Sequence, residues 1–134
     1  MRSPFRFKLR GLGLSLLFLV SCSFGPSSLA AGEVEIRVEN RSKVRIEKVR
    51  VQFPSQTEDY GNIDSEEITE YRVVRNAYRY ARIEAIVDGK PAILQPIDFV
   101  GEKQLKPGRY TYVLKINNKA NSEFTRIRLE CRKD

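Results

Sequence analysis

The sequence contains no histidine and no tryptophan, and its 134 residues include two cysteines and one methionine. Without histidine the chain cannot build a Ser-His-Asp triad, a Cys-His pair or a His-ligated zinc site. Two cysteines are too few for a four-thiolate metal site. A Gly-x-x-x-x-Gly-Lys phosphate loop is also missing. We therefore expect no catalytic residue, no metal and no cofactor.

Positive charge is concentrated at the N-terminus. The formal net charge is +7, but Arg2, Arg6, Lys8 and Arg10 lie in the first ten residues, which hold no acidic residue. Removing these four of the 24 basic residues and none of the 17 acidic ones leaves a net charge of +3. A mildly basic remainder does not favour a nucleic-acid partner.

The first 21 residues have the order of a secretory signal. Residues 1–10 are basic, residues 11–20 read GLGLSLLFLV, and small or polar residues follow. The apolar run is well short of the roughly 20 residues that a permanent membrane-spanning helix needs. A buried core helix is the alternative, and the flanking positive charges disfavour it. We expect residues 1–21 to be a cleaved signal peptide.

Leu19-Val20-Ser21-Cys22 directly follows the apolar run and resembles the lipobox of bacterial lipoproteins. The resemblance implies cleavage before Cys22, lipidation of its sulfur, and an outer-membrane protein facing the periplasm or the cell surface. Residues 22–32 would then be the lipid anchor and a flexible tether. The competing interpretation is cleavage near Ala30, which fits the small-x-small rule and would release a soluble protein. We favour the lipoprotein.

Residues 33–134 are predicted to form one all-β domain. Residues 33–39 alternate strictly between polar and apolar side chains, which predicts a half-buried strand. Asp88-Gly89 between apolar segments is a strong hairpin signal, because both turn positions need positive φ. Further strands are expected at 44–53 with a bulge at 47–48, and at 60–63, 68–75, 77–87, 92–99, 109–116 and 124–131. The spacing predicts an antiparallel immunoglobulin-like β-sandwich of about seven strands.

One segment fits two structures. Arg72, Arg75, Arg79 and Arg82 have the 3-4-3 spacing of one helix face, so residues 65–82 are compatible with a helix. The same residues are rich in β-branched and aromatic side chains, which favour strands. We favour strand.

Leu105-Lys106-Pro107-Gly108-Arg109-Tyr110 resembles the tyrosine corner of Greek-key sandwiches. The following PGRYTYVLKI pattern is similar to immunoglobulin-like and transthyretin-like export domains. The resemblance implies a structural role for Leu105, Pro107, Gly108 and Tyr110, with the Tyr110 hydroxyl bonded to backbone a few residues upstream.

The candidate binding surface combines arginine and tyrosine, which are favoured at binding hot spots. Its residues are Arg75, Tyr78, Arg79, Tyr80 and Arg82. On a strand, Tyr78, Tyr80 and Arg82 would share one face and Arg79 would point to the other. Ordinary cross-strand packing is the alternative. The partners we expect are an envelope protein or an anionic glycan.

Two weaker hypotheses concern acidic residues and a thiol. Asp59, Asp64 and Glu66 supply oxygen ligands for calcium, but their order lacks the D-x-D-x-D-G spacing. Cys131 has no partner in the mature chain, so it is predicted to be a small buried hydrophobe. A reactive thiol is the alternative, without a histidine to activate it.

Taken together, these patterns predict a non-catalytic lipoprotein of the cell envelope whose sandwich is a binding or structural module. A freely secreted or periplasmic binding module and an accessory subunit of an envelope complex are the alternatives.

Overall fold

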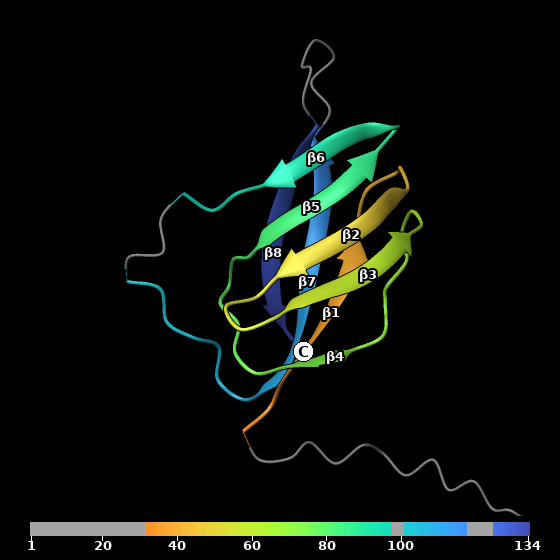
Figure 1. Cartoon of the computed structure of the whole chain (residues 1–134). Coiled ribbons are helices and arrows are strands. Elements are labelled where there is room, and N and C mark those ends of the chain that lie inside the picture. Colours follow the sequence, from red (N-terminus) through yellow and green to blue (C-terminus); the bar gives the residue numbers. More distant parts are fainter. Residues whose placement is uncertain (1–31, 98–100, 118–124) are drawn as a thin grey trace, which may run out of the picture.

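Two four-stranded β-sheets pack face to face in a computed structural model, which describes residues 32–97, 101–117 and 125–134 (Figure 1). These residues contain no helix, and therefore none that is long and apolar enough to cross a membrane. The predicted signal peptide, Cys22 and nearly all of the tether lie outside the described residues. The strands are β1 (Val34–Asn40), β2 (Ile46–Gln52), β3 (Thr57–Ile63), β4 (Arg72–Val74), β5 (Arg82–Val87), β6 (Lys90–Leu94), β7 (Gly108–Asn117) and β8 (Arg126–Lys133). The all-β sandwich is confirmed, with eight strands.

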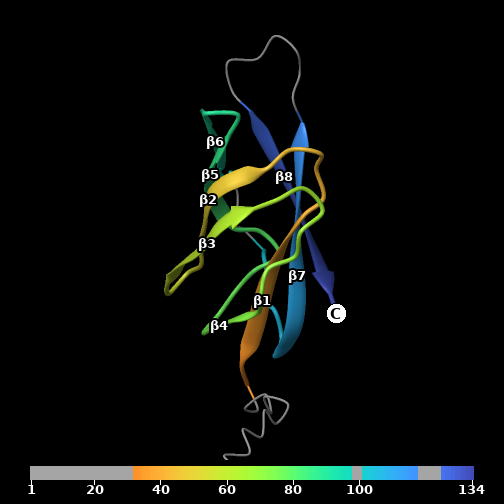
Figure 2. The ribbon, with the colours of Figure 1, turned by 90° about the vertical axis from the view of Figure 1, so that its right-hand side faces the viewer.

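The first sheet has the strand order β4-β1-β7-β8, and the second has the order β3-β2-β5-β6. Figure 2 shows the two layers from the side. All neighbouring strands are antiparallel except β1 and β7, which run parallel from Val34 opposite Gly108 to Asn40 opposite Leu114. A parallel pair needs a long crossover connection, and here the connection passes through the second sheet. The first sheet is therefore mixed, a difference from the wholly antiparallel sandwich expected above.

The predicted hairpin and bulge are both present. Asp88 and Gly89 have φ of 50° and 72°, and they join β5 to β6 with Val87 opposite Lys90. In β2 the pairing register shifts beside Lys48, whose φ is 51°. An extra residue in one strand leaves the local ladder unpaired and bends the strand.

The long strand expected at 77–87 is wrong for its first half, because β5 begins only at Arg82. Carbonyls of the preceding residues accept hydrogen bonds from a loop and from a side chain: the Ala77 carbonyl accepts from the Leu105 N–H, and the Tyr78 carbonyl accepts from the Tyr112 hydroxyl. Between residues 65 and 82 the helix does not form. Apart from Arg82, which is the first residue of β5, strand structure between residues 65 and 82 is limited to β4 and an isolated bridge from Ile68 to Glu39.

The core fills the space between the two sheets with aliphatic side chains and the aromatic rings of Phe53, Tyr60, Tyr110 and Tyr112. Its largest fully buried members are Ile36, Val38, Ile46, Val49, Val51, Ile63, Val74, Ile83, Val87, Tyr112 and Leu114. Both sheets contribute, so neither can keep its apolar face covered without the other.

The expectation of a half-buried first strand is wrong, because β1 is buried on both faces. Glu35 and Glu39, on the outer face, are 8% and 7% exposed. Arg109 covers Glu35, with Nε 2.5 Å from Oε2. Arg41 and Arg132 approach the two oxygens of Glu39 at 2.7 and 3.2 Å. Long basic side chains cover a polar strand face that alternation alone would leave in water.

A buried asparagine joins the two sheets where β1 ends. Asn40 is 0% exposed, and its Nδ2 lies 2.8–3.0 Å from the carbonyl oxygens of Val44, Ile63 and Asp64. Its Oδ1 accepts from the backbone N–H and the hydroxyl of Ser42. The side chain thus supplies hydrogen bonds to backbone groups of the crossover to β2 and of the end of β3.

Candidate functional site

The segment 75–81 connects β4 in the first sheet to β5 in the second and is held at several points. Leu105 N–H donates to the Ala77 carbonyl at 2.8 Å, and the Tyr112 hydroxyl donates to the Tyr78 carbonyl. The Ser55 hydroxyl donates to Asn76 Oδ1 at 2.6 Å. These bonds fix an irregular segment in one conformation, which is the condition for a preorganised site.

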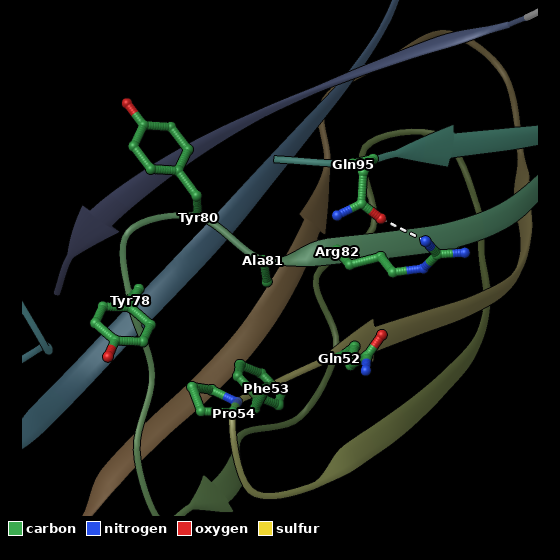
Figure 3. Close-up of a pocket in the computed structure, with 8 residues that line it drawn as sticks. All are labelled: Gln52, Phe53, Pro54, Tyr78, Tyr80, Ala81, Arg82 and Gln95. Carbon is green, nitrogen blue, oxygen red and sulfur yellow. Dashed lines mark hydrogen bonds between the residues drawn. The ribbon is translucent and has the colours of Figure 1, made fainter. Parts of the chain in front are cut away.

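One open pocket, which we call the aromatic pocket, lies against this segment and has a volume of about 560 Å³. It is formed by Gln52, Phe53, Pro54, Tyr78, Tyr80, Ala81, Arg82 and Gln95. Figure 3 shows the two tyrosines on one side of the pocket and the polar side chains of Gln52, Arg82 and Gln95 on the other. Tyr80 is 48% exposed, so a large part of its ring is available to a ligand.

The polar side of the aromatic pocket is built around Arg82. Its guanidinium donates to Glu84 Oε1 at 2.6 and 3.1 Å and also to the Gln95 side-chain oxygen. The hydrogen bond from Arg82 lowers the pKa of Glu84 below its usual value, so this carboxylate stays ionised at neutral pH. The Gln52 amide has no hydrogen bond to any other residue that the structure describes. Arginine and two amides together offer donors and acceptors at one edge of an aromatic surface.

A second pocket, the cationic pocket, lies on the other side of the segment and has a volume of about 320 Å³. It is formed by Arg79, Glu102, Lys103, Gln104, Leu105, Lys106, Tyr110, Cys131 and Lys133. Four of these side chains are basic and one is acidic.

The five residues of the predicted binding surface are therefore divided. Tyr78, Tyr80 and Arg82 meet in the aromatic pocket, as one-sided alternation predicts, and Arg79 lines the cationic pocket. Arg75 is exposed and lines neither; its backbone N–H donates to the Gln56 side-chain oxygen at 3.1 Å. Sequence reasoning missed Gln52, Phe53, Pro54 and Gln95, because they lie at or just after the ends of β2 and β6 and carry no local signal.

The Pro-Gly turn before β7 has the hydrogen bond that a tyrosine corner makes. The Tyr110 hydroxyl donates to the Lys106 carbonyl at 2.8 Å, four residues upstream. Gly108 has φ of 147°, which disfavours any side chain there. Leu105 packs against the core. This turn places the residue 102–106 segment along the rim of the cationic pocket.

The acidic residues between positions 59 and 67, which include the candidate calcium ligands, make contacts within the fold. Asp64 pairs with Arg45 at 3.4 Å, Asp59 accepts from the Gly61 N–H at 2.8 Å, and Glu67 accepts from the Asp64 N–H at 2.6 Å. Within the described ranges no three Cys, Asp or Glu side chains gather in a way that would hold a metal ion.

Cys131 should react slowly with alkylating reagents. Burial raises the pKa of its thiol to about 11, although the nearby Arg79 charge acts to lower it. Since the thiolate is the nucleophile, at pH 8 we expect iodoacetamide to modify it roughly a hundredfold more slowly than an ordinary exposed cysteine. The rate should rise about tenfold per pH unit toward pH 11. Peptide-resolved mass spectrometry measures this, with the urea-unfolded protein as the control; equal rates in both states would contradict it.

Comparison with known proteins supports the fold alone. The solution NMR structure of a protein from Eubacterium rectale is similar to this chain, with a TM-score of 0.52 and 10% sequence identity. The similarity covers 72% of this chain and 87% of that one. No family model matches the sequence, and no curated protein matches it significantly.

Proposed function

We propose that this protein is a non-catalytic lipoprotein of the cell envelope whose β-sandwich binds an acidic glycan in the aromatic pocket. The convergence of Tyr78, Tyr80 and Arg82 with two glutamines is the observation that carries the proposal. Pockets of this size, with aromatic surface and a few convergent polar groups, are typical of ligand sites. Tyrosine faces suit the apolar face of a sugar ring, and guanidinium and amide groups suit hydroxyls and a carboxylate.

The titratable groups near the core and the aromatic pocket give further support for binding without catalysis. The pKa values of Tyr60 and Tyr112 are raised, chiefly by burial, so both phenols stay protonated at neutral pH. Neither lines the aromatic pocket. The ionisable pair in and beside that pocket, Arg82 and Glu84, is held as an ion pair, which suits recognition of polar groups better than proton transfer.

The anchor is tested by the intact mass of the mature protein from membrane and soluble fractions of its host. We expect a membrane-bound product that begins at Cys22 and carries acyl chains. A soluble product that begins near Ala31 would overturn the anchor and support the released binding module.

Ligand binding is tested with the Tyr80→Ala variant on a panel of immobilised acidic and neutral oligosaccharides. We expect the wild-type protein to prefer acidic members, and Tyr80→Ala to bind about tenfold more weakly, because it removes exposed aromatic contact area. Ile93→Ala is the matched control, since Ile93 is 52% exposed and lies outside the pocket. Equal losses in both variants, or no binding to any oligosaccharide, would overturn the glycan assignment.

A further inference from the structure

The cationic pocket lies at the end of the domain where the chain enters it. The Gly108 N–H donates to the Glu33 carbonyl at 3.0 Å, and Val34 pairs with Gly108. Lys106 lies two residues before Gly108, and Lys133 on β8 lies opposite Tyr110 on β7. Figures 1 and 2 show the start of β1 and the start of β7 at the same end of the molecule. Two basic pocket residues, Lys106 and Lys133, are thus close in the fold to the point where the predicted tether ends and the domain begins.

The described residues around this pocket leave most of its positive charge unpaired. Arg79, Lys103, Lys106 and Lys133 surround it with only Glu102 to oppose them, and none of the five forms an ion pair with another described residue. Several other basic side chains on the first sheet are paired, among them Arg109 with Glu35 and Lys115 with Glu130.

The carboxylate next in sequence to Lys133 is already engaged. Asp134 accepts from Thr111 and Tyr71 at 2.6 and 2.7 Å, and it pairs with Arg37 and Arg132 at 3.4 and 3.5 Å. The lining of the pocket adds apolar surface from Leu105, Tyr110 and Cys131. A concave site with one sign of charge and partly apolar walls concentrates the field on an anion.

We propose that the cationic pocket binds the phosphate of anionic lipid headgroups, so that this end of the domain rests on the membrane. The proposal rests on the lipid anchor proposed above. The ten residues between Cys22 and Glu33 span at most about 35 Å even when fully extended, so an anchored domain keeps this end near the bilayer. Several lysine or arginine side chains near an anionic surface add up to firm, salt-sensitive contact.

The test uses the mature protein, purified from its host and reconstituted into vesicles of phosphatidylcholine alone or with 30% phosphatidylglycerol. Amide hydrogen exchange of residues 101–106 is measured in each. We expect exchange at least about threefold slower with phosphatidylglycerol, and this protection should disappear as salt is raised. The Lys103→Gln/Lys106→Gln variant should lose the protection. Lys43→Gln/Lys90→Gln removes the same charge from exposed positions outside the pocket and should retain it.

Three results would overturn the proposal: equal exchange in the two vesicle types, equal loss in the two double variants, or the same protection produced in phosphatidylcholine vesicles by free glycerol phosphate. The last result would assign the pocket to a soluble phosphate compound. The intact mass of the same preparation reports the acyl anchor separately. If the protein carries no acyl chain, flotation with the same vesicles and variants measures headgroup binding, so failure of the anchor and failure of the pocket remain distinct.

Discussion

Replacing Asn40 with alanine should lower the free energy of unfolding by about 3 kcal/mol, because it leaves buried carbonyl groups without donors. The Asn40 side-chain N–H groups donate to the carbonyls of Val44, Ile63 and Asp64, and the Ser42 N–H donates to Asn40 Oδ1. A single lost hydrogen bond costs on the order of 1 kcal/mol, but each buried group left unsatisfied adds its own desolvation cost. Since Asn40 is fully buried, water cannot replace the amide without opening the structure.

Urea unfolding followed by circular dichroism measures the effect, with Asn62→Ala as the control. Asn62 is exposed, and its side-chain oxygen accepts one hydrogen bond, from the Lys48 N–H at 3.0 Å. We expect the control to lose less than about 1 kcal/mol. Equal losses in the two variants would show that the Asn40 bonds between the sheets contribute no more than one surface contact.

The Tyr112→Phe variant should loosen the segment that forms one side of the aromatic pocket. Tyr112 is fully buried, its ring lies 6.0 Å from that of Phe53, and its hydroxyl bonds to the Tyr78 carbonyl. Phenylalanine keeps the ring packing and removes the bond. We expect a loss of about 1–2 kcal/mol in unfolding free energy and faster amide exchange across residues 76–81.

Tyr60→Phe provides a matched control, because it removes an equivalent bond in a different place. Tyr60 is also buried, and its hydroxyl donates to the Ile36 carbonyl at 3.0 Å within the core. The two variants should be destabilised by similar amounts, but only Tyr112→Phe should change the exchange of residues 76–81. If both variants, or neither, changed that exchange, the Tyr112 hydroxyl would have no specific role in holding the segment.

The fold could be predicted from the sequence wherever the signal is local. Alternation gave β1, Asp88-Gly89 gave the β5–β6 hairpin, and the slip at Glu47-Lys48 gave the bulge. The parallel pairing of β1 with β7 could not be predicted, because no local pattern encodes which distant strand lies alongside. The burial of Glu39 could not be predicted for the same reason, because Arg132, one of the residues that cover it, lies on β8, the last strand.

The candidate site was predictable in its residue types and only partly in its geometry. Alternation placed Tyr78, Tyr80 and Arg82 together and Arg79 apart, although Tyr78 to Ala81 are not in a strand. The glutamines of the aromatic pocket and the lysines of the cationic pocket come from segments that meet only after folding. Single polar residues in such segments look like ordinary surface until the topology is known.

The parallel pairing of β1 and β7 also bears on how fast the protein folds. Glu35 and Arg109, joined by an ion pair across these strands, are 74 positions apart in the chain. Closing so long a loop before its contacts form is entropically costly, and sandwiches of high contact order fold in milliseconds to seconds. In a chain that crosses a membrane N-terminus first, β1 would wait for its β7 partner until most of the domain had followed. Folding that has to wait for the C-terminal strands would leave such a polypeptide unfolded during its passage. An unfolded chain is the form that can pass through a narrow channel.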